Sequence, residues 1–307
     1  MINFYGLMYF SRKDLNPNLS IKYMRNKNRI FCKNAENLSH SLTKQGLKFT
    51  LLTNNKIKCL KYLDAKVEVV EIKFNNLLKY PIKFNSAHYK IDVLKYLSKK
   101  KTMSCLIDLD VVAINKIPNF FFRCKKKKIN MLYDLHPKKR YHNNILNSLN
   151  ICNNSDSNLG KHWYGGEFIF ATPKFFFRIY KEIVDKIYIN YIKNYNKLYH
   201  VGDEMLLNAA IQNLGKKISF IEISQKKIIS RYWSINTIEK KKNIKNYLNS
   251  FLLHLPADKK YLSKINMLSI DYNEFKKFYL NYLNSFKKII YNKLQILYRR
   301  IYGYLYL

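Results

Sequence analysis

Two carboxylates, those of Asp108 and Asp110, lie one residue apart inside the apolar stretch Cys-Leu-Ile-Asp-Leu-Asp-Val-Val-Ala-Ile of residues 105–114. The flanking residues are apolar and partly β-branched, as in a strand of a parallel sheet that is covered on both faces. Burying an unpaired carboxylate in such a strand is costly. The pair is therefore expected either at the end of a strand or around a bound cation.

A third candidate ligand for that cation is His254, in Leu-Leu-His-Leu-Pro-Ala-Asp-Lys. Two carboxylates and one imidazole form a ligand set that suits Mn²⁺ better than Mg²⁺. Such an ion would bind the diphosphate of a nucleotide and neutralise charge that develops on it as a leaving group. Each signal is weak alone, because Asp-x-Asp pairs occur by chance and a single histidine is more often a core or surface residue.

The composition indicates a folded but very basic protein. The 307 residues are 48% apolar and 15% aromatic. The chain contains 56 Lys and Arg residues but only 20 Asp and Glu residues, which gives a formal charge of +36. This excess is typical of proteins that bind nucleic acid or an anionic membrane. However, the lysines are spread along the whole chain, and Lys, Asn, Ile, Tyr and Phe are together abundant, as A+T-rich coding produces. Acidic lipid and phosphate-bearing substrates are the other partners that the charge fits.

Five cysteines are present, an odd number, and no two form a Cys-x-x-Cys pair. Neither a disulfide framework nor a zinc cluster is therefore expected, which favours a reducing setting. The N-terminal run, residues 1–13, lacks the features of a signal peptide, and no apolar stretch approaches the roughly 20 residues that span a bilayer. We expect a cytoplasmic protein, or one that lies peripherally on the inner face of the cell membrane.

Strand-like and helix-like segments alternate along the chain. Strands are predicted over residues 2–10, 47–52, 67–74, 103–114, 129–133 and 167–171, and helices over residues 34–45, 90–99, 174–195 and 203–214. This rhythm is typical of an α/β protein with a mostly parallel, doubly wound sheet, whose ligand site lies beyond the carboxyl ends of the strands. Residues 143–158, which are rich in Asn and Ser, are predicted as a loop or lid.

The chain from residue 273 onward is predicted to be helical. In residues 286–307, five basic side chains, those of Lys287, Lys288, Lys293, Arg299 and Arg300, alternate with Ile, Leu and Tyr. A basic amphipathic helix of this kind either lies in the headgroup region of a membrane or packs on the rest of the protein. We therefore divide the chain into a domain of residues 1–264 and a basic, aromatic C-terminal extension of residues 265–307.

Three further motifs follow the Asp-x-Asp pair in order. They are Tyr-Gly-Gly-Glu-Phe-Ile-Phe-Ala-Thr-Pro-Lys-Phe-Phe at residues 164–176, Gly-Asp-Glu-Met-Leu-Leu-Asn-Ala-Ala at residues 202–210 and His-Leu-Pro-Ala-Asp-Lys at residues 254–259. Over roughly residues 1–262 the chain resembles glycosyltransferases of the GT-A fold, above all the glycogenin and bacterial lipopolysaccharide galactosyl- and glucosyltransferase group, glycosyltransferase family 8.

The resemblance implies a Rossmann-like sheet flanked by helices and a metal-dependent hexosyltransferase. Such an enzyme uses Mn²⁺ or Mg²⁺ and moves a hexose from a nucleotide-diphosphate sugar, with UDP-hexose favoured, to a glycan. A lipopolysaccharide or capsule-type chain, free or lipid-linked, is the implied acceptor, and the anomeric configuration is expected to be retained.

The resemblance also implies roles for single residues. Asp108, Asp110 and His254 would bind the metal. Asp203 would bind hydroxyls of the donor sugar, although an Asp at a helix start is equally well explained as an N-cap. Glu204 is the alternative candidate for acid–base work.

Further donor-binding roles fall on Thr53, Asn54, Lys90, Gly165, Gly166 and Lys259. The chain departs from the family at Lys259, because the family usually has a Gly between its His and Lys and one more residue of spacing, so Lys260 is a substitute candidate. Ordinary explanations compete here too: a turn at Thr53 and Asn54, and a solvated helix lysine at Lys90.

Acceptor-binding roles fall on Glu167 and Trp233. Trp233, together with Tyr232, could line an acceptor groove, although aromatic residues are more often part of a core.

Two other classes of function remain open from the sequence. The charge of +36 fits a nucleic-acid-binding protein, although no specific nucleic acid is expected, and a GT-A-like scaffold could lack activity.

Overall fold

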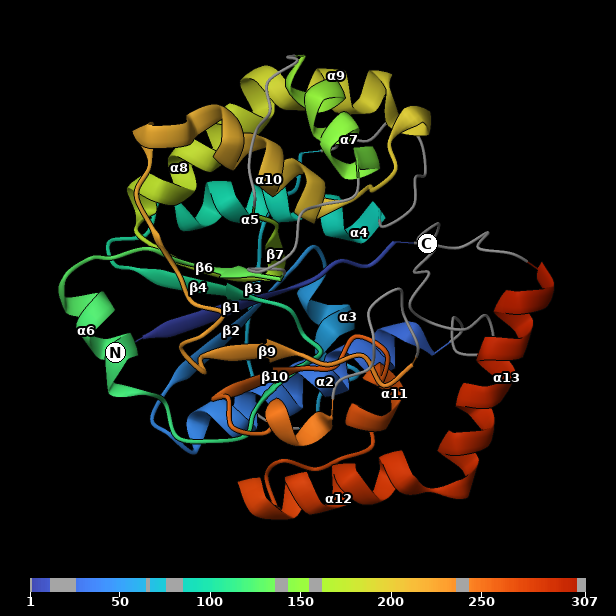
Figure 1. Cartoon of the computed structure of the whole chain (residues 1–307). Helices are drawn as coiled ribbons and strands as arrows, with labels where there is room; N and C mark the ends of the chain where they lie inside the picture. The colour runs from blue at the N-terminus through green and yellow to red at the C-terminus, as the bar shows by residue number, and fades with distance from the viewer. Residues whose placement is uncertain are drawn as a thin grey trace.

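The computed structural model (Figure 1) describes residues 2–11, 26–64, 67–75, 85–135, 143–154, 162–235 and 243–302, with side chains as far as residue 294. Its centre is a seven-stranded sheet in the order β3-β2-β1-β4-β7-β6-β8. The strands are β1 (Asn3–Met8), β2 (Lys48–Thr53), β3 (Glu68–Glu71), β4 (Ser104–Ile107), β6 (Met131–Asp134), β7 (Tyr164–Ala171) and β8 (Ile221–Glu222). Every neighbouring pair is parallel except the two pairs that contain β7. The predicted mostly parallel sheet is confirmed.

A second, three-stranded sheet lies beside the first. It consists of β5 (Val111–Ala113), β10 (Leu252–His254) and β9 (Ile229–Arg231), in that order. The single strand predicted over residues 103–114 is therefore wrong: β4 belongs to the large sheet, β5 to the small one, and Leu109 and Asp110 form the turn between them. The chain leaves the large sheet at the point where its two carboxylates begin, because neither could continue into an apolar core.

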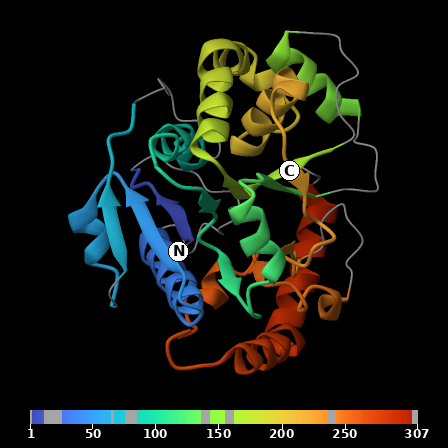
Figure 2. The same ribbon diagram turned by 90° about the vertical axis from the view of Figure 1, so that its left-hand side faces the viewer.

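Helices cover both faces of the large sheet (Figures 1 and 2). The helices are α2 (Lys27–Thr43), α3 (Lys56–Leu60), α4 (Asn85–His88), α5 (Lys90–Leu97), α6 (Asn119–Lys126), α7 (Asn143–Asn153), α8 (Pro173–Glu182), α9 (Tyr188–Lys193), α10 (Asp203–Leu214), α11 (Lys259–Leu262), α12 (Tyr272–Asn284) and α13 (Phe286–Tyr302), with a π-helical turn at Ile183–Ile187. In Figure 1, α5 and α7–α10 lie above the sheet, and α2 and the small sheet lie below it.

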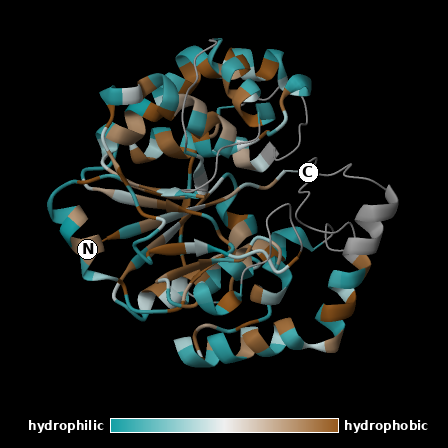
Figure 3. Cartoon of the chain, viewed as in Figure 1, coloured by the Kyte–Doolittle hydropathy of each residue, from teal (hydrophilic) through white to brown (hydrophobic). Residues whose placement is uncertain are grey.

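Alternating strand residues supply two cores, one on each face of the large sheet. Tyr5, Leu106 and Ile169 pack toward the side of α5, α8 and α10, whereas Phe4 and Phe170 pack toward the side of α2 and α6. Figure 3 shows the apolar residues of the strands between polar outer helix faces. Burial on both faces explains the nearly continuous apolar runs in these strands.

Three helix predictions need correction or refinement. Residues 143–153 form α7 instead of the predicted loop, because Leu149 and Cys152 are buried at helical spacing; residues 155–158 of that prediction lie outside the described part. The helix predicted over residues 174–195 is interrupted by the π-helical turn. The C-terminal segment forms α12 and α13, which meet at Ser285, and Asp271 caps α12 through a capping box with Glu274.

Helix α12 packs on the domain through a third core, which includes Leu253, Leu262, Phe275 and Tyr279. None of the helices in the part of the chain that the structure describes is long and apolar enough to span a bilayer.

Asp92 on α5 is a buried carboxylate with an incomplete set of partners. Its Oδ1 accepts a hydrogen bond from the backbone N–H of Asn75 (3.2 Å), and its Oδ2 has no partner among the described residues. Burial raises the pKa of Asp92 to about 6, although the Asn75 bond and Lys95 act in the opposite direction. Because the unfolded carboxyl has a pKa of about 3.9, the folded state binds more protons between those values. The free energy of unfolding should therefore fall as pH rises through that window.

We predict that Asp92→Asn raises the free energy of unfolding at neutral pH by about 1 kcal/mol, because it removes the charge and keeps the acceptor for Asn75. The gain should shrink toward zero near pH ~4, where the carboxyl is protonated. Urea unfolding at both pH values measures this, with the exposed Asp185→Asn as the control. A gain of equal size at both pH values would contradict the argument.

Candidate metal and donor site

The three predicted metal ligands meet where the two sheets adjoin. Asp108 follows β4, Asp110 precedes β5, and His254 ends β10, opposite Val111 of β5. The backbone N–H of Leu255 donates to the carbonyl of Asp110 (2.9 Å), which fixes the His254 segment against the turn. Nε2 of His254 lies 3.3 Å from Oδ1 of Asp110 and 3.9 Å from Oδ2 of Asp108.

The donor set fits a divalent cation. One ligand atom each from Asp108, Asp110 and His254 lie within 4.8 Å of one another. Behind the imidazole, Nδ1 of His254 lies 3.5 Å from Oε1 of Glu167 and has no hydrogen-bond partner among the described residues. A carboxylate behind a ligating histidine orients the ring and raises its basicity. Two hard oxygen donors and one imidazole are the chemistry that Mn²⁺ and Mg²⁺ sites use, with the imidazole favouring Mn²⁺.

Charges inside the cluster compensate one another. Burial lowers the pKa of His254, but the carboxylates of Asp110 and Glu167 outweigh it and raise that pKa to about 9. Burial raises the pKa of Asp110, but the Lys259 ammonium group and the His254 imidazolium outweigh this effect and keep the pKa of Asp110 well below its usual range. A cation that binds Nε2 would take the place of a proton there.

Two lysines bring positive charge to the aspartates from opposite sides. Nζ of Lys90, the first residue of α5, lies 2.6 Å from Oδ1 of Asp108 and 2.5 Å from Oδ2 of Asp203. Nζ of Lys259 contacts Oδ2 of Asp110 and donates to the carbonyl of Pro256 (3.0 Å). Although burial acts to lower it, the pKa of Lys90 is raised by its two carboxylate neighbours. The structure thus places both lysines at the candidate metal site, and Lys90 is not a solvated helix residue.

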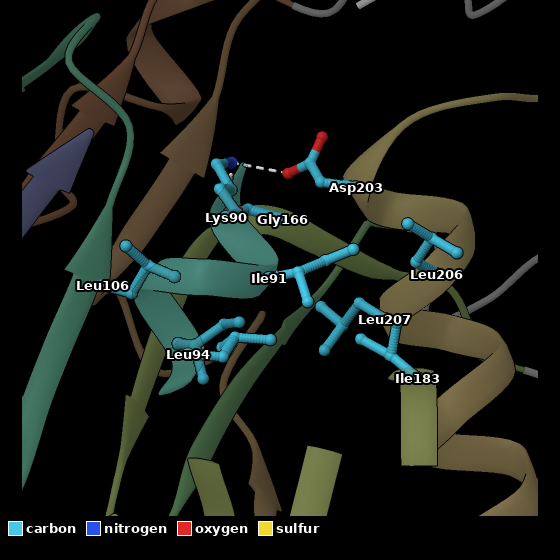
Figure 4. A pocket seen from close by; sticks show the side chains of 10 residues that line it. Lys90, Ile91, Leu94, Leu106, Gly166, Ile183, Asp203, Leu206 and Leu207 are labelled. Atoms are coloured by element: carbon cyan, nitrogen blue, oxygen red, sulfur yellow. Dashed lines mark hydrogen bonds and ion pairs between the residues drawn. The ribbon is translucent and has the colours of Figure 1, made fainter. Parts of the chain in front are cut away.

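Asp203 is the first residue of α10. The N-cap of this helix is Gly202, whose φ of 117° suits glycine. The alternative explanation of Asp203 as the N-cap is therefore wrong. Its carboxylate faces Lys90, as Figure 4 shows, at the mouth of a cavity of about 20 Å³ whose walls are otherwise apolar. Lys90 also donates to the carbonyl of Gly166 (2.9 Å), so α5, β7 and α10 meet at this one ammonium group.

Gly165 and Gly166 leave room for carboxylates. A Cβ atom at Gly165 would collide with the Glu167 carboxylate, and one at Gly166 would collide with the Asp203 carboxylate. Neither glycine is required by a positive φ. The pair therefore permits close packing of charged groups against the β7 backbone.

Arg231, which the sequence reasoning missed, ties Glu167 and Glu204 together. Its Nε donates to Oε1 of Glu167 (2.8 Å), and its Nη2 contacts Oε2 of Glu167 (2.6 Å) and Oε1 of Glu204. Trp163 donates from Nε1 to Oε2 of Glu204 (3.1 Å). Glu167 is completely buried, and despite that burial Arg231 and His254 depress its pKa. Arg231 carries no motif that could have found it in a chain this rich in basic residues.

The other predicted residues are more dispersed. Asn54 lines an open pocket of about 450 Å³ with Tyr9, Glu71, Ile72, Lys73 and Phe74, beyond the carboxyl ends of β1, β2 and β3. Its side chain bonds both backbone groups of Phe10. Thr53 is completely buried and accepts a bond from the N–H of Asn55, as in an ordinary turn.

On the acceptor side, Tyr232 packs against Tyr247 and Tyr279 in the core, whereas Trp233 is partly exposed. Lys260, the substitute for Lys259, is partly buried. The donor and acceptor roles of all these residues stay predictions.

The packing at Gly166 yields a prediction about stability. Gly166→Ala should lower the free energy of unfolding by about 1–3 kcal/mol, because the added methyl group displaces the Asp203 carboxylate from Lys90. In an Asp203→Ala background, Gly166→Ala should lower the free energy of unfolding by much less. Urea unfolding of the four proteins of this double-mutant cycle measures the difference. Equal costs in the two backgrounds would show that the glycine is not needed for the approach of Asp203.

Solved structures share this architecture, although no protein-family model and no curated protein sequence matches the chain. Two crystal structures of the galactosyltransferase LgtC, one of an active-site mutant and one of a complex with donor and acceptor sugar analogues, superpose with a TM-score of 0.52 at 8% identity. In each case the match covers 86% of this chain and 95% of LgtC. The predicted GT-A fold is thereby confirmed: this chain is an α/β protein with the GT-A fold and a helical C-terminal extension.

Proposed function

We propose that the chain is a metal-dependent glycosyltransferase that moves a hexose from a nucleotide-diphosphate sugar to a glycan. One observation carries the proposal: Asp108, Asp110 and His254 converge at the carboxyl end of β4, with Lys90 and Asp203 beside them. In α/β sheets of this kind, ligands bind at the carboxyl ends of the strands. A fold shared with LgtC, whose complex contains donor and acceptor sugar analogues, supports the same class of substrate.

The side chains at this site would bind three different parts of the metal-bound donor: the cation, the diphosphate and the sugar. Asp108, Asp110 and His254 would bind Mn²⁺ or Mg²⁺, which when bound supplies charge that stabilises a leaving diphosphate. Lys90 and Lys259 place ammonium groups beside that site for the phosphate oxygens. Asp203, next to Lys90, would accept hydrogen bonds from donor-sugar hydroxyls. Positioning and electrostatic stabilisation, more than covalent chemistry, then account for the rate.

The remaining groups fit a donor side and an acceptor side. The pocket beside Asn54, at the ends of β1–β3, offers space for the nucleoside, for which we favour uridine. Glu204 is bound by Arg231 and Trp163, whereas Asp203 lies beside the Lys90 ammonium group that also contacts Asp108, which favours Asp203 over Glu204 as the group nearest the reacting carbon. Complete burial of Glu167 favours orientation of His254 over direct contact with the acceptor. Trp233 is the better candidate for the acceptor. Retention of configuration and a surface-polysaccharide acceptor complete the proposal.

A ligand screen tests this function directly. We expect one class among UDP-, GDP- and CDP-sugars to raise the melting temperature in the presence of Mn²⁺, because a ligand at about 100 times its Kd stabilises a protein by about 2.7 kcal/mol. Asp110→Asn should abolish the rise, and the exposed Asp185→Asn should preserve it. No response to any nucleotide sugar would refute the proposal. If random duplex DNA instead binds in a salt-sensitive way that Asp110→Asn leaves unchanged, the nucleic-acid alternative is favoured.

We also propose that α13 contacts an anionic membrane surface. Phe286, Ile289, Ile290 and Leu294 are exposed on this helix, and the exposed Lys287 and Lys293 lie among them. Apolar side chains interspersed with lysines suit the headgroup region of acidic lipid. The location would be the cytoplasmic face, where a lipid-linked acceptor is made available.

Vesicle flotation tests the membrane contact. The full chain should float with phosphatidylglycerol-containing vesicles and not with pure phosphatidylcholine, since each basic residue contributes about 1 kcal/mol near an anionic surface. Ile289→Ser combined with Leu294→Ser should weaken flotation, whereas Ile57→Ser, at an exposed site on α3, should not. Equal flotation of all three proteins would contradict a role for α13.

A further inference from the structure

A buried carboxylate next to the donor site is bound entirely by the C-terminal extension. Asp258 is 1% exposed, and its Oδ2 accepts from the Tyr279 hydroxyl (2.7 Å). Its Oδ1 accepts from the Tyr282 hydroxyl (3.0 Å) and from Nζ of Lys288 (2.7 Å). Tyr279 and Tyr282 belong to α12 and Lys288 belongs to α13, so both C-terminal helices bind this one carboxylate.

The chemistry of Asp258 is unusual for its place in the fold. Asp258 is the N-cap of α11, where an Asp side chain normally accepts a bond from the helix backbone, but no such bond is present. The carboxylate instead turns to α12 and α13. A buried ion pair between Asp258 and Lys288, both nearly inaccessible, needs these additional hydroxyl donors to be tolerated. Capping of α11 therefore does not explain the residue.

The same short segment carries the donor-site groups. His254 lies four residues before Asp258, and Lys259, which contacts Asp110, follows it directly. The backbone N–H of Asp258 donates to the carbonyl of Leu255 (3.0 Å), whose own N–H donates to Asp110 (2.9 Å). Movement of Asp258 would thus be transmitted to Lys259 by the covalent chain and to the Asp110 turn by hydrogen bonds.

Aromatic packing reinforces this connection. The Tyr261 ring stacks on that of Tyr282, with centroids 4.1 Å apart, and lies 5.5 Å from that of Tyr279. In Figure 1, α11 lies between the body of the protein and the two C-terminal helices. The extension therefore contacts the segment of residues 254–262 through both charge and rings.

We propose that Asp258 is a positioning residue for the donor site and that α12 and α13, through Tyr279, Tyr282 and Lys288, fix the Lys259 ammonium group beside Asp110. The C-terminal extension is then part of the site that binds the metal-complexed diphosphate, in addition to any membrane contact. This inference rests on the proposed function for its link to the diphosphate, and on the contacts of Asp258 alone for the placement of Lys259.

The test compares full-length Lys288→Met and Tyr279→Phe with the matched control Tyr272→Phe. Tyr272 also lies on α12, and its hydroxyl bonds the backbone carbonyl of Ser41 (3.1 Å), away from Asp258. Acetylation of Lys259 by an N-hydroxysuccinimide ester, followed by mass spectrometry, reports its placement without any ligand. We expect severalfold faster acetylation in Lys288→Met, a smaller increase in Tyr279→Phe and no change in Tyr272→Phe. Lys288→Arg should restore slow labelling, and thermal unfolding verifies that each variant is folded.

Calorimetric titration of the same proteins with UDP and Mn²⁺ measures the link to the donor site. We expect Lys288→Met to weaken UDP binding roughly tenfold and Tyr272→Phe to leave it unchanged. Unchanged acetylation of Lys259 in Lys288→Met would overturn the positioning role. Faster acetylation with unchanged UDP affinity would show that the extension does not serve the donor site, which also overturns the proposal. If the natural chain binds no nucleotide, the proposed function fails and so does the link to the diphosphate, while the acetylation rates still decide how Lys259 is placed.

Discussion

The structure depends on compensation of negative charge at the junction of its two sheets. The carboxylates of Asp108, Asp110, Glu167, Asp203 and Glu204 lie within one connected network. The compensating cations come from four separate elements: Lys90 from α5, Arg231 from β9, His254 from β10 and Lys259 from α11. Removing any one would leave the carboxylates that it contacts with less compensating charge, which is more costly at the buried Asp110 and Glu167 than at a surface pair. This requirement joins elements that are remote in the sequence.

The same constraint shapes the chain locally. Two aspartates are too costly to bury within an apolar strand. Strand β4 therefore ends at Ile107, and after a turn the chain continues as β5 in the small sheet. His254 reaches the turn because β10 pairs with β5. Gly165 and Gly166 keep the neighbouring strand free of side chains where the carboxylates approach. The need to compensate these carboxylates therefore accounts both for the arrangement of the strands and for the composition of the candidate site.

Much of this arrangement was predictable from the sequence. Nearly continuous apolar runs and helical spacing located the strands and helices of the large sheet, and the unusual pair of aspartates pointed to the edge that holds the candidate site. The small sheet was not predictable, because β9 and β10 are three residues long and pair across large sequence separations. Arg231 was hidden among 56 basic residues, and α7 was misjudged because Asn and Ser conceal the buried face of Leu149 and Cys152. Tertiary contacts, which local patterns do not encode, decided each of these cases.

The central claim is that Asp108, Asp110 and His254 bind one divalent cation. The most direct measurement is anomalous X-ray diffraction at the manganese edge, on crystals of the protein grown with Mn²⁺ and UDP. The account predicts one strong anomalous peak at about 2–2.5 Å from a carboxylate oxygen of each aspartate and from Nε2 of His254. No peak there at saturating Mn²⁺, with the Lys259 ammonium still in contact with Asp110, would contradict it.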